Sequence, residues 1–290
     1  MDVLTARQKA ADILQQEVLS CELMPFGLTN FSYRINTQSR SYVYRTPAPG
    51  ADALVNRLHE GDAIRKIAML DLDVPVVFFD VASGEKITLF IDTVPSAQTP
   101  PAGRIAGACT LLRRLHNSAI IFDNAFAVMD KLDQYEAVMK ANGILLPSGY
   151  KVVRHRVNLL YEELTALLKG EKLVACHNDV VPENIITDAA GNNFLIDWEY
   201  AGMNDPAWDL AAYSLESGLN MEEEDELILL YFNGVCSGSI MYRMLIHKIC
   251  QDVLWCLWAK IKSHFGADLL SYAEYRYKRA LNHLLHGKQY

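Results

Sequence analysis

The sequence predicts an α+β protein with two parts, a small antiparallel sheet with a helix and a larger, mainly helical part. Alternation of apolar and polar residues is concentrated in residues 1–91, whereas helical spacing dominates the remainder of the 290-residue chain. Between them, DTVPSAQTPPAG at 92–103 is rich in Pro, Thr and Ser, which is typical of a linker. We therefore expect an N-terminal lobe over 1–91, a linker over 92–103 and a C-terminal lobe over 104–290.

The N-terminal lobe begins with an amphipathic helix, because apolar residues recur at helical spacing in MDVLTARQKAADILQQ. Residues 28–47 then alternate with period two and predict two strands joined by a polar turn. Helical spacing returns over 56–70, and VPVVFFD and EKITLFI predict two more short strands. Together these elements form a small, mainly antiparallel sheet with helices.

The C-terminal lobe is predicted to be mostly helix, with long helical patterns over 104–118, 152–170 and 240–265. The acidic run at 221–226 is most simply a helix start with a solvated face. A short apolar run, NFLID, predicts one strand within this lobe.

Composition restricts the class of partner and the compartment. The net charge of -8 argues against a nucleic-acid surface and suits a neutral or cationic small molecule. The six Cys form no C-x-x-C pair and no Cys/His cluster at zinc spacing, so we expect reduced core thiols. The N-terminus lacks the apolar stretch of a signal peptide, and no run of about 18 apolar residues occurs, so we expect a cytoplasmic protein without a membrane partner.

Oxygen-bearing side chains cluster around the predicted strand NFLID. Asp179 is followed five residues later by Asn184, and Asp197 ends the strand. Such a set suits Mg²⁺, which takes one or two carboxylates together with phosphate oxygens and water. Each residue alone could instead belong to an ordinary turn or helix cap. The combination H-x-D-x-x-x-x-N, which begins at His177 and is followed by a strand and an Asp, is much more specific.

The motifs carry a family resemblance over nearly the whole chain. HNDVVPEN resembles the catalytic loop of the protein-kinase-like phosphotransferases, and LIDWEYAGMNDPAWDLA is similar to the matching segment of choline/ethanolamine kinases, most closely the bacterial LicA-type choline kinases. The resemblance extends to four further stretches, GLTNFSYRI, YVYR, NRLHE and LWCLWA. The resemblance implies a two-lobed protein-kinase-like fold, ATP and Mg²⁺ as cofactors, and transfer of the γ-phosphoryl group to choline.

The resemblance also implies roles for the motif residues. Asp179 matches the catalytic Asp that orients the acceptor hydroxyl or accepts its proton, while Asn184 and Asp197 match the metal ligands. His177 matches a position that braces the loop, and Asp209 matches a buried Asp that holds the loop's backbone.

On the nucleotide side, the turn has one Gly where protein kinases have several. The residues implied to contact the nucleotide or support its site are Thr29, Asn30, Ser32, Arg45, Glu60 and Ile91. Arg45 stands where protein kinases have Lys and could pair with Glu60 while binding phosphate. The alternative for Arg45 is an ordinary surface position on a strand.

On the acceptor side, the resemblance implies an aromatic box with one acid. Its candidates are Tyr200, Glu216, Trp255, Trp258 and either Tyr272 or Tyr275. Aromatic faces attract a trimethylammonium group, whereas an ammonium with N–H donors prefers oxygens, so choline is favoured over ethanolamine. By themselves, two Trp at helical spacing would be read as core. The alternatives are another hydroxyl acceptor, namely ethanolamine, an aminoglycoside or methylthioribose, and a catalytically silent nucleotide-binding protein.

Overall fold

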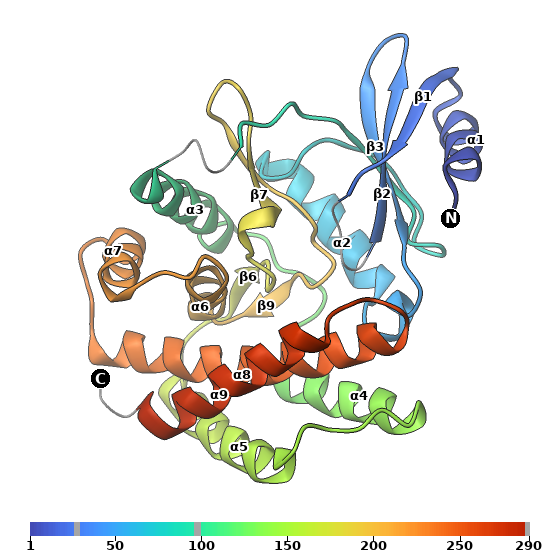
Figure 1. Cartoon of the computed structure of the whole chain (residues 1–290). Coiled ribbons are helices and arrows are strands. Elements are labelled where there is room, and N and C mark those ends of the chain that lie inside the picture. The colour runs from blue at the N-terminus through green and yellow to red at the C-terminus, as the bar shows by residue number, and fades with distance from the viewer. Residues whose placement is uncertain (26–29, 96–99, 288–290) are drawn as a thin grey trace. The chain divides into compact units, whose positions relative to one another are not determined.

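The computed structural model describes residues 1–25, 30–95 and 100–287 (Figure 1). The chain forms two compact units. The first comprises Met1–Gln98 and Asn184–Glu199, and the second comprises Thr99–Glu183 and Tyr200–Tyr290. The predicted α+β class, an antiparallel sheet followed by a mainly helical part, is confirmed.

The division differs from the predicted one in two places: the helix Pro101–His116 begins within the predicted linker at 92–103, and one later segment changes unit. We expected residues 184–199 in the C-terminal lobe, but they belong to the first unit. Backbone hydrogen bonds explain this: Leu195 N–H donates to Leu72 O at 2.7 Å, and Val94 N–H donates to Thr187 O at 2.8 Å. The segment is therefore attached to the unit that holds the sheet.

The first unit is built on a five-stranded antiparallel sheet of order β1-β2-β3-β5-β4. Its strands are β1 (Val18–Leu23), β2 (Asn30–Thr37), β3 (Ser41–Pro47), β4 (Val76–Phe79) and β5 (Lys86–Leu89). The helices are α1 (Val3–Leu14) and α2 (Arg57–Ile67), and the added segment forms the hairpin β7 (Ile185–Thr187) and β8 (Asn193–Leu195).

Strand alternation gives the sheet two different faces. Ala6 and Ala10 of α1 pack into one buried cluster with Tyr33, Tyr44 and other apolar residues of the sheet. Because successive side chains of a strand point to opposite faces, Arg45 of β3 lies on the face away from that cluster. The sheet therefore has an apolar face under α1 and a face that carries buried charge.

The second unit is mainly helical. Its helices are α3 (Pro101–His116), α4 (Val128–Ala141), α5 (Tyr150–Leu167), α6 (Pro206–Glu216), α7 (Met221–Tyr231), α8 (Gly238–His264) and α9 (Leu270–His286). A short antiparallel pair, β6 (Val174–Cys176) and β9 (Gly202–Asn204), lies among them. The predicted acidic helix start is α7, where Asn220 and Glu223 form a capping box.

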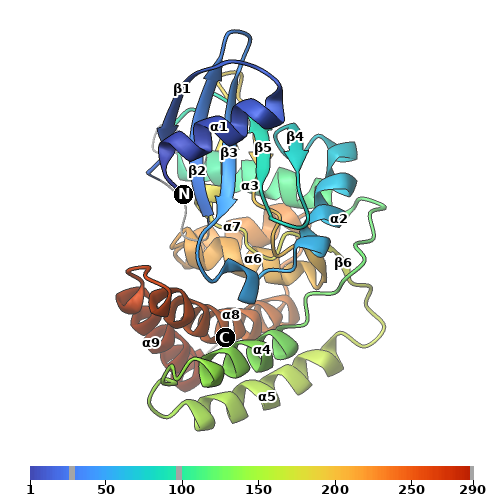
Figure 2. The ribbon, with the colours of Figure 1, turned by 90° about the vertical axis from the view of Figure 1, so that its right-hand side faces the viewer.

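The long helix α8 is the central element of the second unit. It is buried on nearly all sides from Met244 to Lys262, as expected for a helix surrounded by others. Figures 1 and 2 show α9 running along it. Within the described residues, no helix combines the length and apolarity needed to cross a membrane.

Candidate functional site

The charged face of the sheet in the first unit centres on Arg45. Its guanidinium pairs with Glu60 of α2 through Nη2, and its Nη1 donates to Asp197 Oδ1 at 2.5 Å. Arg45 is 5 % exposed and Glu60 is fully buried. The predicted pair between Arg45 and Glu60 is therefore present, and the alternative of a surface strand position for Arg45 is wrong.

Asn184 and Asp197 are brought together by the segment that joins the first unit. Ile196 N–H donates to Asn184 O at 2.9 Å. The backbone of Asn184 therefore lies beside that of Ile196, the residue directly before Asp197. Asp197 has the left-handed φ of 68°, which Asp tolerates better than most residues. Its side chain is 29 % exposed, against 7 % for Arg45 and 0 % for Glu60. A side-chain amide oxygen and a partly exposed carboxylate are donor types that fit Mg²⁺.

Sequence reasoning missed Glu199, a third acid of this cluster. Its Oε2 accepts from Asn30 Nδ2 at 3.2 Å and lies 3.5 Å from Arg57 Nη1. Burial and the negative charge of Asp197 raise the pKa of Glu199 to about 7, against the opposing charge of Arg45. The signal was available, because Glu199 lies two residues after Asp197 in the segment that carries the motif.

The remaining nucleotide-side candidates are spread along the strands of the first unit. Asn30 is buried at the start of β2, and Ser32 pairs with Arg45 across β2 and β3. Ile91 is half-buried two residues beyond β5, and Thr29 lies outside the described residues. Lys86, which sequence reasoning also missed, is 5 % exposed on β5, with its Nζ 3.9 Å from Glu60 Oε1.

The predicted catalytic loop lies in the second unit and is fixed through its backbone. Asp209 of α6 accepts from His177 N–H and Asn178 N–H, both at 2.8 Å, and His116 Nε2 lies 3.0 Å from Asp209 Oδ2. Asn178 has φ 67°. These contacts agree with the predicted structural role of Asp209. The two residues whose backbone it holds directly precede Asp179 in the chain.

His177 also braces the loop from within. Its ring is fully buried, and its Nδ1 accepts from the backbone N–H of Asp179 at 3.3 Å. Trp208 Nε1 donates to Asn178 O at 3.1 Å. The side chain of Asp179 is half-buried, and the loop that carries it is held by these hydrogen bonds.

Three of the predicted acceptor residues form a continuous aromatic run in the second unit. The rings of Tyr200 and Trp255 meet edge-to-face with centroids 5.2 Å apart, and those of Trp255 and Trp258 meet likewise at 6.0 Å. All three are less than 9 % exposed. The three rings therefore form one contiguous, buried aromatic group with the edge-to-face geometry that aromatic pairs prefer.

Glu216, at the end of α6, is already paired with arginine. Its Oε1 contacts Arg276 Nη1 and lies 3.9 Å from Arg279 Nη2. Arg276 is fully buried and donates to the hydroxyl of Tyr272 at 2.9 Å. Glu216, the acid predicted for the box, thus contacts a buried guanidinium. Sequence reasoning missed this partner because the two residues are far apart in the chain.

The two C-terminal Tyr candidates differ in environment. Tyr272 is half-buried, and burial together with the charge of Asp179 raises its pKa, so its hydroxyl stays protonated at neutral pH. Tyr275 is 57 % exposed and stacks on Arg279 with its ring centroid 5.0 Å from Cζ. Tyr272 is the better placed of the two beside Asp179.

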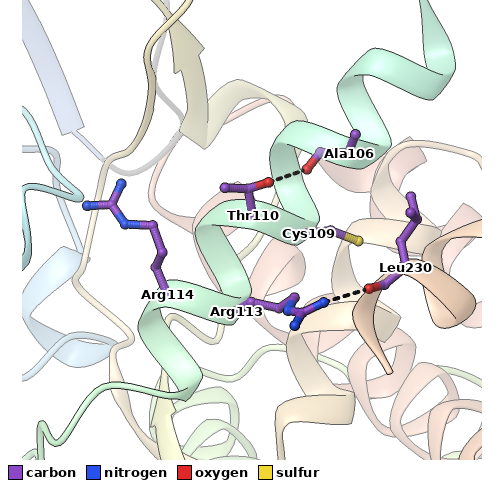
Figure 3. Close-up of a pocket in the computed structure, with 6 residues that line it drawn as sticks. All are labelled: Ala106, Cys109, Thr110, Arg113, Arg114 and Leu230. Carbon is purple, nitrogen blue, oxygen red and sulfur yellow. Dashed lines mark hydrogen bonds between the residues drawn. The ribbon is translucent and has the colours of Figure 1, made fainter. Parts of the chain in front are cut away.

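A separate pocket of about 430 Å³ lies between α3 and α7 in the second unit (Figure 3). It is lined by Ala106, Cys109, Thr110, Arg113, Arg114 and Leu230. Arg113 Nη1 donates to Leu230 O at 3.1 Å across it. None of the predicted site residues lines this pocket, so it is distinct from the side chains described above.

Comparisons with known proteins agree with the motifs. Protein LicA of Haemophilus influenzae strain KW20 is 31% identical over 257 residues, which cover 85% of this chain and 94% of that protein. The crystal structure of choline kinase LicA from Streptococcus pneumoniae superposes with a TM-score of 0.85 and 33% identity, covering 97% of this chain and 98% of that one. A LicA structure in complex with AMP superposes with a TM-score of 0.83 and 32% identity, covering 97% of each chain.

The match to a family model covers residues 21–245 and therefore includes the Arg45 cluster, the catalytic loop and the segment with Asn184 and Asp197. With relatives above 30% identity over most of their length, this match is decisive. The chain belongs to the phosphotransferase enzyme family.

Proposed function

We propose that this chain transfers the γ-phosphoryl group of ATP to the hydroxyl of choline, giving phosphocholine and ADP. The observation that carries the proposal is the edge-to-face run of Tyr200, Trp255 and Trp258, in a chain 33% identical to a choline kinase over 97% of its length. Aromatic faces stabilise a desolvated quaternary ammonium by roughly 2 kcal/mol. Tyr200, Trp255, Trp258, Glu216 and Tyr272 are hereafter the acceptor cluster.

Asp179 is the proposed catalytic carboxylate. It would accept the hydroxyl proton of choline, or orient that hydroxyl for attack on the γ-phosphorus. The rigid backbone before it, held by Asp209, supports such a role because a catalytic group must keep its geometry. The charge of Asp179 also acts on Tyr272, which belongs to the acceptor cluster.

In the first unit, Arg45 and the residues Thr29, Asn30 and Ser32 are proposed to bind the nucleotide phosphates. Arg45 is pre-organised for this by Glu60, and a planar guanidinium can bind two phosphate oxygens at once. Asn184 and Asp197 would hold Mg²⁺. When bound there, Mg²⁺ supplies positive charge that neutralises the transferred phosphoryl group.

A substrate panel tests the proposal directly. ADP release is measured with the purified full chain at fixed ATP and Mg²⁺ against choline, ethanolamine and kanamycin. We expect the highest kcat/KM with choline, because a trimethylammonium group suits an aromatic box better than a hydrated ammonium does. If kcat/KM with ethanolamine equals or exceeds that with choline, the acceptor is ethanolamine. If only kanamycin is turned over, the acceptor is an aminoglycoside. No turnover with any of them would favour a nucleotide-binding protein without activity.

A further inference from the structure

Beside the acceptor cluster, the second unit holds an unusual concentration of buried charge. Asp252 of α8 is fully buried and lies one helical turn before Trp255. It accepts two hydrogen bonds from Arg279, at 2.8 Å from Nε and 2.7 Å from Nη2, and its Oδ1 lies 2.6 Å from Arg276 Nε. Its carboxylate therefore bridges two arginines of α9.

The same two arginines face Glu216. Arg276 contacts Glu216 Oε1, and Arg279 Nη2 lies 3.9 Å from that oxygen, farther than its 2.7 Å from Asp252. Burial and the charge of Arg279 lower the pKa of Arg276, but a guanidinium keeps its proton in a protein, so both arginines are cations. Without Asp252, the two guanidinium groups would share Glu216 as ion-pair partner, and the charge beside the acceptor cluster would be more positive by one unit.

Other titratable groups facing Asp252 do not change this balance. His283 Nδ1 lies 4.0 Å from Asp252 Oδ2, and burial lowers the pKa of His283 to about 4, so this ring is neutral at pH 7. Lys248, one turn before Asp252 on α8, is paired with Glu224. The ion pairs around Glu216 therefore depend on Asp252, Arg276 and Arg279. The charge of Asp179 acts on Arg276 and Tyr272 as well, and it is the same with and without Asp252.

We propose that Asp252 is a specificity-determining residue that keeps the acceptor cluster receptive to a cation. Asp252 pairs with Arg279 and neutralises its charge. Glu216 then has only Arg276 as a close cationic partner. The inference rests on the proposed function, since it concerns the acceptor's charge. A buried carboxylate that served only packing would affect cationic and neutral acceptors equally, and this difference makes the two roles separable.

The test compares choline with its neutral isostere 3,3-dimethyl-1-butanol, in which carbon replaces the quaternary nitrogen. For the wild-type full chain and for Asp252→Asn, one measures the KM for choline, the Ki of the isostere against choline, and the KM for ATP. We expect Asp252→Asn to raise the KM for choline about tenfold and to change the other two constants less than about twofold. Equal changes for choline and the isostere, or no change for choline, would overturn the proposal.

Charge restoration provides the second arm. Asp252→Asn combined with Arg279→Gln removes one charge of each sign and should return the KM for choline to within about threefold of wild type. Arg279→Gln alone should lower the KM for choline relative to the Ki of the isostere, and it supplies the test if Asp252→Asn does not fold. A double variant as impaired as the single, together with an unaltered choline-to-isostere ratio in Arg279→Gln, would contradict the inference.

A matched control is Asp205→Asn, which also removes a buried carboxylate paired with arginine in the same unit, at the start of α6. It should leave the choline-to-isostere ratio unchanged. A ratio altered as strongly as in Asp252→Asn would show that any lost buried acid has this effect and would overturn the proposal. A wild-type chain that fails to use choline would refute the proposed function itself, before any variant is compared.

Discussion

At the scale of single residues, substitution of Asp179 gives the most direct test of the proposed reaction. Asp179→Asn keeps the shape of the side chain but removes its ability to accept a proton. We expect kcat to fall by about a hundredfold to ten-thousandfold, the usual contribution of a positioned general base. Binding of a fluorescent ATP analogue should be retained, because the nucleotide residues lie in other elements. Turnover near that of wild type would remove Asp179 from the reaction.

The aromatic run can be tested by removing a π-face while keeping an apolar side chain. Trp255→Leu should raise the KM for choline by about tenfold or more, equivalent to about 1.4 kcal/mol, with little change in the KM for ATP. Trp255→Phe is the matched control, because it retains an aromatic face and should recover most of the affinity. If both variants lose stability and both KM values rise together, Trp255 is a core residue.

At the scale of elements, the start of α6 joins a helix cap to a buried ion pair. Asp205 accepts from Ala207 N–H and pairs with Arg243 and His247 of α8. Burial alone would raise the pKa of Asp205, but the hydrogen bonds and charges of His247 and Arg243 outweigh it and lower that pKa well below 3.8. Asp205 thus stabilises the folded state only while it is ionised.

The sign of the pH dependence follows from this depressed pKa. The contribution of Asp205 is present above the unfolded-state value and is lost as the pH falls through it toward the lower folded-state value. Asp205→Asn should lower the free energy of unfolding by about 3 kcal/mol at pH 5, since it leaves buried cations unpaired. The difference from wild type should be smaller at pH 3, where urea unfolding gives the comparison. A difference that stays constant between the two pH values would contradict the assignment.

Several elements could be predicted because their signals are local. Alternation at 28–47 and helical spacing at 56–70 correspond to β2, β3 and α2, and the acidic run at 221–226 is the capped start of α7. The motif around Asp179 was equally local, since it consists of residue types at fixed intervals.

Other features depend on partners distant in the chain and could not be predicted. The pairing of Glu216 with Arg276 joins residues 60 positions apart, and no periodicity records it. The attachment of the β7–β8 hairpin to the first unit depends on Leu195 and Leu72 meeting through backbone atoms, which carry no sequence signature. Strand β1 lacks a clear alternation and was likewise not anticipated.

At the scale of the whole molecule, the first unit is discontinuous in sequence. A fragment of residues 1–98 lacks the hairpin, and with it Asp197, a partner of Arg45, and the backbone hydrogen bonds to Leu72 and Val94. We expect this fragment to show no cooperative transition in urea, because it exposes buried cations and unpaired backbone groups. The same fragment joined by a Gly/Ser linker to residues 184–199 should regain one. A cooperative transition in the short fragment alone would show that the hairpin is dispensable for folding.

The discontinuity also orders events during synthesis on the ribosome. At about 5–20 residues per second, roughly 5–20 s separate completion of the first stretch of this unit from the arrival of its last one. During that interval the nascent chain contains Arg45 and Glu60 but lacks Asp197 and Glu199, the other acidic partners of Arg45. The charged groups of this incomplete cluster must then stay hydrated or be shielded by a chaperone. The late segment carries the proposed metal ligands as well. The first unit would therefore complete its fold and gain its metal ligands at the same time. A translation product that ends before residue 184 would have neither the complete fold nor the metal ligands.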